Sequence, residues 1–149
     1  MLISSRRLIK FNNMQDYIRK VNYCETDKMG IVHHSNYVRW LEEARIDFLE
    51  QINCSLVEIE KHGIVSPVTE VGCSYKTPTV FGDTVRISVK IQEFKGVRLV
   101  LDYEIYNNKT NALVLTAQTQ HCFTGGEGKP VVLKKVLPEY DKRIKECIG

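Results

Sequence analysis

The spacing of apolar residues changes once along the chain, near residue 63, and this change limits the folds that the chain can adopt. Before it, apolar residues recur every three to four positions over about four turns, which predicts an amphipathic helix capped by Ser35 or Asn36. A second, short helix is predicted over residues 55–61, ending at Gly63. The apolar positions of the long helix are Tyr37, Trp40, Leu41, Ala44, Phe48, Leu49 and Ile52.

After residue 63, apolar residues alternate with polar ones, which is typical of half-buried strands. Pro67 interrupts the first of these segments, so we expect this segment either to bend or to lie near the edge of a sheet. Because the strands follow one another without helices between them, the order indicates an α+β domain with one antiparallel sheet against one main helix. The expected strands are residues 17–23, 64–75, 85–91, 97–105 and 112–123, and a terminal helix is expected over 138–147.

Length and charge support one globular domain and argue against nucleic-acid binding. The chain has 149 residues, enough for one domain with a real core. Its net charge of +3 arises from basic residues near the two ends, so we expect solvated ends and no nucleic-acid partner. No apolar run approaches the ~20 residues of a membrane span.

The spacing of the five cysteines indicates reduced thiols and no metal site. They form no C-x-x-C pair, and no secretory signal precedes them, so we expect a cytoplasmic protein without disulfides. A local group of potential metal ligands lacks the spacing of structural zinc sites, and we expect no metal there. That group contains Cys24, Glu25, Asp27, His33 and His34.

Residues 23–37 join a predicted strand to the long helix and are rich in titratable and turn-forming residues. Loops of this length within a compact domain are often functional. The loop ends at a helix N-terminus, where free backbone N–H groups favour negative charge. A carboxylate ahead of such amides suits acyl transfer, because the acid can act as base or nucleophile while the amides hold an oxyanion.

This segment resembles the signature of hotdog-fold acyl-CoA thioesterases. Residues 27–37 read Asp-x-x-Gly-Ile-Val-x-His-x-Asn-Tyr, as in the 4-hydroxybenzoyl-CoA thioesterases and the bacterial Tol-Pal-associated acyl-CoA thioesterases. A Phe-Gly-Asp turn at residues 81–83 matches a second feature of the family. The resemblance covers roughly residues 17–126.

The resemblance implies a five-stranded antiparallel sheet wrapped around one long central helix. The hotdog domain would span residues 15–128, between an N-terminal extension (1–14) and a C-terminal tail with a short helix (129–149). Family members pair their strands across a homodimer, or assemble further into a homotetramer, with the active site at the subunit interface.

The resemblance also assigns residues to the site. Asp27 takes the place of the catalytic carboxylate, as nucleophile or as general base. The backbone N–H of His34 matches the oxyanion position and its imidazole a site histidine, while Tyr23 matches a tyrosine whose hydroxyl would support the carboxylate. Asn36 and Tyr37 are expected to fix the loop and the helix start. The remaining residues of the substrate and oxyanion region are Gly30, Ile31, Val32 and His33.

The expected reaction is hydrolysis of acyl-CoA thioesters, without any cofactor beyond the coenzyme A of the substrate. Candidate contacts for the coenzyme A phosphates are Lys76, Lys95, Arg98 and Lys129. A hotdog hydratase, which would use a His with an Asp or Glu on the helix, is disfavoured, because the long helix is expected to contain no histidine. A module that binds acyl-CoA or acyl carrier protein without turnover stays open, as do the acyl chain length and a preference for aryl groups.

Overall fold

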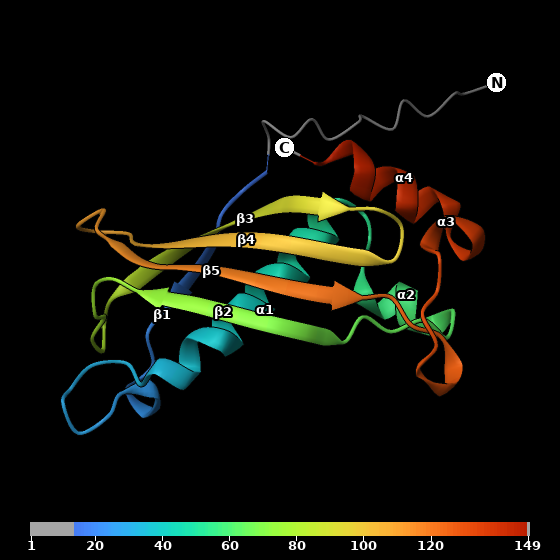
Figure 1. Cartoon of the computed structure of the whole chain (residues 1–149). Helices are drawn as coiled ribbons and strands as arrows, with labels where there is room; N and C mark the ends of the chain where they lie inside the picture. Colours follow the sequence, from blue (N-terminus) through green and yellow to red (C-terminus); the bar gives the residue numbers. More distant parts are fainter. Residues whose placement is uncertain (1–13, 149) are drawn as a thin grey trace.

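The computed structural model describes residues 14–148, so the expected N-terminal extension lies outside the described residues except for Met14. Five antiparallel strands form one sheet in the order β1-β3-β4-β5-β2 (Figure 1). This arrangement confirms the predicted α+β architecture. The strands are β1 (Tyr17–Lys20), β2 (Val68–Tyr75), β3 (Thr84–Phe94), β4 (Arg98–Asn107) and β5 (Leu113–Cys122).

The long predicted helix is confirmed as α1, although it begins earlier than expected. The cap is His33, so the prediction of Ser35 or Asn36 as cap was wrong; the His33 imidazole accepts the Ser35 N–H in their place. The first strand ends before residue 23, where the chain turns into a short 3₁₀ helix. The helices are α1 (His34–Gln51), α2 (Leu56–Lys61), α3 (Leu133–Val136) and α4 (Pro138–Glu146), with 3₁₀ turns η2 (Tyr23–Glu25) and η3 (Gly126–Gly128).

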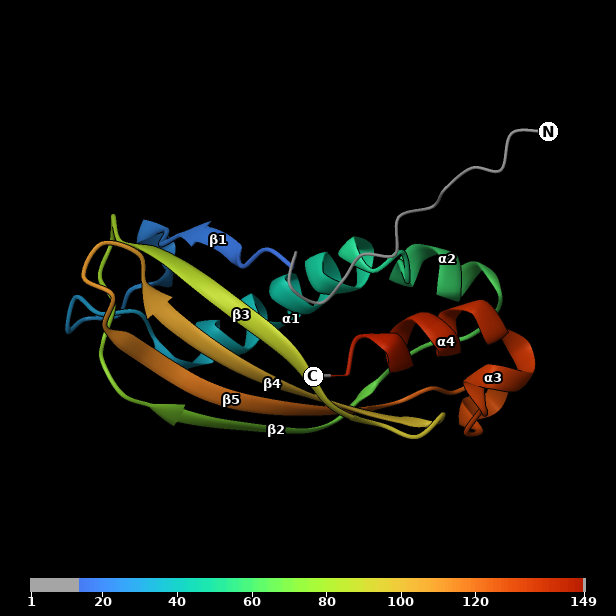
Figure 2. The same cartoon turned by 90° about the horizontal axis from the view of Figure 1, so that it is seen from above.

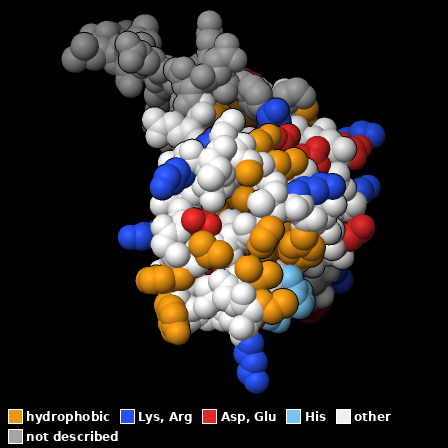
Figure 3. Space-filling view, turned by 90° about the vertical axis from the view of Figure 1, so that its left-hand side faces the viewer, with side chains coloured by type: hydrophobic (Ala, Val, Ile, Leu, Met, Phe, Trp, Pro, Cys, Tyr) orange, Lys and Arg blue, Asp and Glu red, His pale blue; other side chains and the backbone are white. Residues whose placement is uncertain are grey.

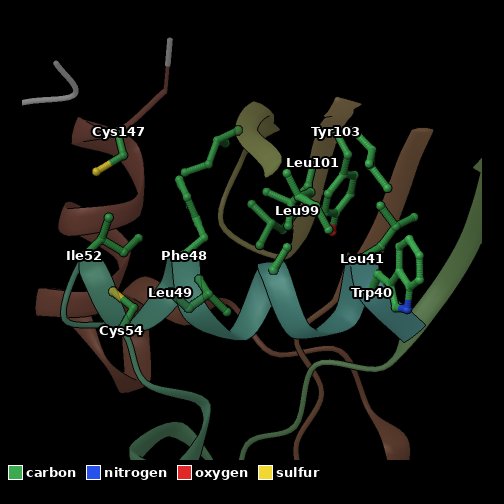
Figure 4. Close-up of a cluster of buried hydrophobic side chains, with 14 of the residues drawn as sticks. Trp40, Leu41, Phe48, Leu49, Ile52, Cys54, Leu99, Leu101, Tyr103 and Cys147 are labelled. Carbon is green, nitrogen blue, oxygen red and sulfur yellow. The ribbon is translucent and has the colours of Figure 1, made fainter. Parts of the chain in front are cut away.

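The sheet curves around α1 (Figure 2). Buried apolar side chains of both form one core cluster between them. Side chains of α1, including Leu41 and Phe48, lie beneath Leu99, Leu101 and Tyr103 of β4 (Figure 4). Each of these side chains is at most 4 % exposed, so the apolar stripe of α1 is the inner face of the domain. Among the described helices, none has the length and apolar character needed to cross a membrane.

The C-terminal helices complete the core at the end of α1 that lies away from its N-terminus. Leu133 of α3 and Ile144 of α4 are fully buried in the same cluster as the sheet residues. Ile148 adds a parallel bridge to Ile91, on the part of β3 that extends beyond the short strand β1. The segment after residue 128 therefore packs as part of the hydrophobic core.

Strand β2 is a sheet edge whose apolar side chains are left exposed by residues 14–148. It pairs with β5 on one side only. Val68 is 45 % exposed, Val71 39 % and Tyr75 50 %. An exposed apolar edge of this kind is a surface for pairing with another chain. Pro67 immediately precedes the strand, in agreement with the predicted edge position.

A chain of polar groups is buried between β4 and β5. The Tyr103 hydroxyl and the Thr119 hydroxyl are 2.8 Å apart, and Thr119 Oγ1 lies 2.7 Å from His121 Nε2. His121 is fully buried. Burial, assisted by the charge of Arg45, lowers the pKa of His121 to about 4, so the imidazole is neutral in the folded protein at pH 5 to 7.

This neutral histidine predicts a loss of stability in mild acid. In the unfolded chain His121 takes up a proton below its ordinary pKa of about 6.5, whereas the folded protein resists protonation down to about 4. The unfolded state therefore binds more protons between these values, and the free energy of unfolding falls as pH falls. Lowering the pH from 7 to 5 is expected to cost about 2 kcal/mol through this one group.

The measurement is chemical unfolding of the wild type and of His121→Gln at pH 7 and pH 5. The variant has no imidazole at this position, so its stability should change less with pH, by about the same 2 kcal/mol. Equal pH dependence in the two proteins would show that His121 does not contribute.

Candidate active site

The loop between η2 and α1 is closed on itself by backbone hydrogen bonds. The N–H of Asp27 donates to the Ile31 carbonyl over 2.8 Å, and the N–H of Gly30 donates to the Asp27 carbonyl over 3.0 Å. An antiparallel bridge joins Thr26 to Val32 at the base. Gly30 has a φ of 78°, a left-handed conformation that glycine adopts without strain. The loop is therefore a defined turn that fixes the position of Asp27.

Asp27 presents a half-buried carboxylate at the start of this turn. Its Oδ1 accepts the backbone N–H of Met29 over 2.7 Å, which fixes the side chain in an Asx turn. The other oxygen has no hydrogen-bond or ion-pair partner among residues 14–148. Asp27 therefore combines a fixed orientation with one oxygen that can react.

The N-terminus of α1 lies at the other end of the loop. His33 Nδ1 accepts the Ser35 N–H over 3.3 Å and lies 2.8 Å from Ser35 Oγ. His34 is the first helical residue, where a backbone N–H has no acceptor within the helix. Because α1 has 18 residues, this end carries the positive pole of a substantial helix dipole. Such an end attracts a negative charge that develops on a ligand.

One open groove of about 380 Å³ brings the carboxylate and the helix end together. Most of its surface is apolar or aromatic, and the ring centres of Tyr37 and Tyr75 are 5.7 Å apart. On the same end of the molecule, apolar side chains gather beside histidine (Figure 3). The lining residues are Asp27, Met29, Ile31, Val32, His34, Tyr37, Tyr75, Lys76, Thr77 and Pro78.

The groove is assembled from distant parts of the sequence. The Tyr75 hydroxyl donates to the His34 carbonyl over 3.2 Å, which joins the end of β2 to the start of α1. The Tyr37 hydroxyl lies 2.7 Å from Thr79 Oγ1, and the Val32 N–H donates to the Thr79 carbonyl. A smaller hollow of about 130 Å³ lies between β1, α1 and β3, and neither histidine nor cysteine lines it. Of these two cavities, both lined by described residues, the groove at the loop is the one that combines a carboxylate with a helix N-terminus.

Several of the predicted site residues support the groove from outside. Tyr23 is 76 % exposed and packs edge-on against Phe81, with the ring centres 5.5 Å apart. His33 caps the helix, and Gly30 shapes the turn. The side-chain amide of Asn36 donates to the Glu25 carbonyl over 2.9 Å. These residues help to fix the shape of the loop.

The candidate phosphate contacts fall at two ends of the protomer. Lys76 lines the groove. Lys95 and Arg98 lie at the turn between β3 and β4, at the other end of the sheet, where Lys95 pairs with Glu93 over 3.0 Å. Lys129 follows η3 and lies 3.7 Å from Glu127. Within one protomer, only Lys76 of these four residues belongs to the groove.

The sequence reasoning gave no role to Glu25, which is buried beside the loop and is 7 % exposed. Burial alone would raise the pKa of this carboxyl, but hydrogen bonds from Arg19, Trp40 and the Asn22 backbone outweigh it and lower the pKa below its ordinary value. The sequence does contain a local pattern that points to Glu25: Asn22 and Glu25 have the N-x-x-E spacing of a capping box, and the structure forms this capping box. Tyr75 and Thr79 were also missed, since only the tertiary fold brings them to the loop.

The described residues contain no group of three or more His, Cys, Asp or Glu side chains that could hold a metal ion. All five cysteines are free. The groove itself offers a carboxylate, an imidazole and the start of a long helix, groups that can serve in acid–base chemistry and in holding an oxyanion.

Comparisons with known proteins agree on one family. The model of the thioesterase-like superfamily matches residues 21–140. The putative acyl-CoA thioesterase YneP of Bacillus subtilis is 32 % identical over 121 residues, which cover 81 % of this chain and 88 % of YneP. The 1,4-dihydroxy-2-naphthoyl-CoA hydrolase of Thermosynechococcus vestitus is 30 % identical over 135 residues, covering 89 % and 92 % of the two chains.

The solved structures give the same result. The DHNA-CoA thioesterase from Staphylococcus aureus superposes with a TM-score of 0.85 at 31 % identity, with 89 % of each chain covered. The two proteins therefore share the fold over most of both chains.

Proposed function

The chain belongs to the thioesterase-like superfamily, and from this membership we propose that it hydrolyses acyl-CoA thioesters to free acid and coenzyme A. The observation that carries the proposal is the pairing of the Asp27 carboxylate with the N-terminus of α1 in one groove. No cofactor is needed, since coenzyme A enters as part of the substrate. The five free cysteines suit a reducing compartment, and we place the reaction in the cytoplasm.

In the proposed reaction the thioester carbonyl lies between Asp27 and the start of α1. If Asp27 is the nucleophile, its free oxygen adds to the carbonyl carbon, the C–S bond breaks, and the thiolate of coenzyme A leaves behind a mixed anhydride that water hydrolyses. If Asp27 is a general base, it takes a proton from water, and the resulting hydroxide adds to the same carbon. Both routes give one acid and one thiol for each water consumed.

Either route places a negative charge on the carbonyl oxygen, and the backbone N–H of His34 is the proposed donor to it. This N–H has no acceptor within α1, and the helix dipole favours the charge. The His34 imidazole lines the groove and can donate a proton to the departing thiolate. Tyr75 holds the His34 carbonyl and so limits movement of this residue.

We further propose that the active unit is at least a homodimer formed through β2. The edge of β2 and its exposed apolar residues would pair with the same strand of a second copy, which would continue the sheet and bury Val68 and Val71. The groove is open beside Tyr75, the last residue of this strand, so the second copy would close it. The site would then lie at the subunit interface.

Such a dimer would also bring the basic residues Lys95 and Arg98 of one copy to the groove end of the other. A two-fold axis reverses the direction of the second copy, so the turn with Lys95 and Arg98 of one copy would lie at the same end of the joined sheet as the groove of the other. We propose that these residues, together with Lys76, attract the phosphates of coenzyme A.

The test is release of free thiol from a panel of acyl-CoA and acyl carrier protein esters, including short, long and aryl acyl groups. Turnover of at least one ester is the expected result. Tight binding of esters without thiol release would instead support a module that binds acyl-CoA or acyl carrier protein. The panel also determines the acyl preference.

A further inference from the structure

The buried carboxylate of Glu25 lies beside the loop, and the proposed reaction gives it no chemical step. Its Oε1 accepts Arg19 Nη1 over 2.7 Å and the Asn22 backbone N–H over 2.8 Å. Its Oε2 accepts the indole N–H of Trp40 over 2.7 Å. One side chain thus joins the end of β1, the turn η2 and the second turn of α1.

The backbone of Glu25 fixes the loop as well. Its carbonyl accepts the His33 N–H and the side-chain amide of Asn36, both over 2.9 Å. Its own N–H donates to the Asn22 carbonyl over 3.1 Å. Glu25 is therefore bonded to both ends of the loop. Asp27 follows Glu25 by two positions, and His34 follows His33, whose N–H the Glu25 carbonyl accepts.

The contacts of Glu25 form a charged network. The Arg19 guanidinium also donates through Nε to Glu43 Oε2 over 2.7 Å and lies over the Trp40 ring, 4.7 Å from its centre. Burial acts to lower the pKa of Arg19, but its hydrogen bonds to Glu25 and Glu43 outweigh burial and raise it. Glu25 and Arg19 are therefore both charged at neutral pH. Removal of the Arg19 charge leaves the buried Glu25 carboxylate without its ion-pair partner, whereas Arg19 keeps Glu43 if Glu25 is replaced.

We propose that Glu25 is the positioning residue of the active site: by joining Arg19 to Trp40, its carboxylate holds the loop so that Asp27 and the His34 N–H face the same groove. The inference rests on the proposed function of Asp27. Glu25 does not line the groove, so its effect on the reaction passes through the loop. Displacement of a reacting group by about 1 Å can lower a rate by about 10²-fold.

The first test compares Glu25→Gln with Glu43→Gln. Both variants remove one carboxylate charge from Arg19. Glutamine has only one acceptor oxygen, so only Glu25→Gln also leaves either the Trp40 indole or the Asn22 N–H facing an amide NH2 group in place of an oxygen. Glu25→Gln is expected to lower kcat by about 10²-fold with KM changed by no more than about two-fold. Glu43→Gln is expected to keep both constants within about two-fold. A folded Glu25→Gln protein with wild-type kcat would overturn the proposal.

A second variant decides the matter if Glu25→Gln does not fold. Trp40→Phe keeps an aromatic ring in the core and removes the indole N–H that holds Glu25, together with part of the buried ring. The expected result is a kcat about ten-fold lower with little change in KM, the size of one lost hydrogen bond to a charged group. A wild-type kcat in this variant would count against a positioning role.

A third measurement does not depend on turnover. Amide hydrogen exchange of residues 26–33 should be faster in Glu25→Gln than in the wild type and unchanged in Glu43→Gln. The emission of Trp40, the only tryptophan of the chain, should shift in the same variant and not in the control. Unchanged exchange in this loop would refute the proposal. If the wild type cleaves no thioester, the proposed function fails by itself, and the exchange data still decide the role of Glu25.

Discussion

Replacing Asp27 with Asn is expected to lower kcat by about 10³-fold while the protein still binds the thioester. Asparagine has nearly the same shape, and its side-chain oxygen can still accept the Met29 N–H that fixes the Asx turn. It has no negative charge, however, so it can neither attack the carbonyl nor take a proton from water. The measurement is steady-state thiol release, together with the dissociation constant of the unreacted ester.

Asp83→Asn is the matched control for this variant. Asp83 lies in the turn before β3, where its Oδ2 accepts the Val80 N–H over 2.9 Å, just as Asp27 accepts that of Met29. It does not line the groove, and we expect its kcat to stay within about three-fold of the wild type. If Asp27→Asn were as active as this control, the role assigned to Asp27 would be wrong. A single turnover in ¹⁸O-water tests the anhydride route in the wild type, since label recovered in the Asp27 carboxyl would establish that water attacked an anhydride at this residue.

The second large effect is expected from a charge on the exposed edge strand. In Val71→Arg, a guanidinium replaces a 39 % exposed apolar side chain in the middle of β2. If two copies pair through this strand, like charges meet across the two-fold axis and the dimer dissociates. Because the proposed groove needs the second copy, kcat/KM is expected to fall by about 10²-fold. Light scattering after size-exclusion chromatography gives the mass, and thiol release gives the activity.

Ile18→Arg on the opposite edge of the sheet is the control for charge and bulk. Ile18 lies on β1 and is 54 % exposed, so the same substitution places the same charge on an edge strand away from β2. This variant should keep the wild-type mass and activity. A monomeric Val71→Arg protein with full activity would show that one protomer holds a complete site.

Much of the fold could be predicted because it follows local rules. The spacing from Tyr37 to Ile52 defines α1, and the alternation around Ile87 and Leu101 defines two central strands, because one face of each must be buried. Pro67 correctly indicated the edge position of the neighbouring strand. The short helix α3 was missed because its four residues are too few to show a period.

The site was less predictable, for physical reasons. Asp27 and His34 lie close in sequence, so their pattern could be recognised before the structure, and the structure places both in one groove. Tyr75 and Lys76 reach it only because β2 runs back along the sheet to the start of α1, and no local pattern encodes this contact. The helix start was misplaced because an imidazole, rather than a hydroxyl or amide, caps it.

The most direct test of the proposed hydrolysis is the value of kcat/KM for the wild-type protein with its best acyl-CoA ester. We expect a value of at least about 10⁴ M⁻¹s⁻¹, within the usual range of enzymes, that falls with Asp27→Asn and not with Asp83→Asn. If no ester in the panel releases thiol faster in the wild type than in Asp27→Asn, the proposed hydrolysis at this groove is contradicted.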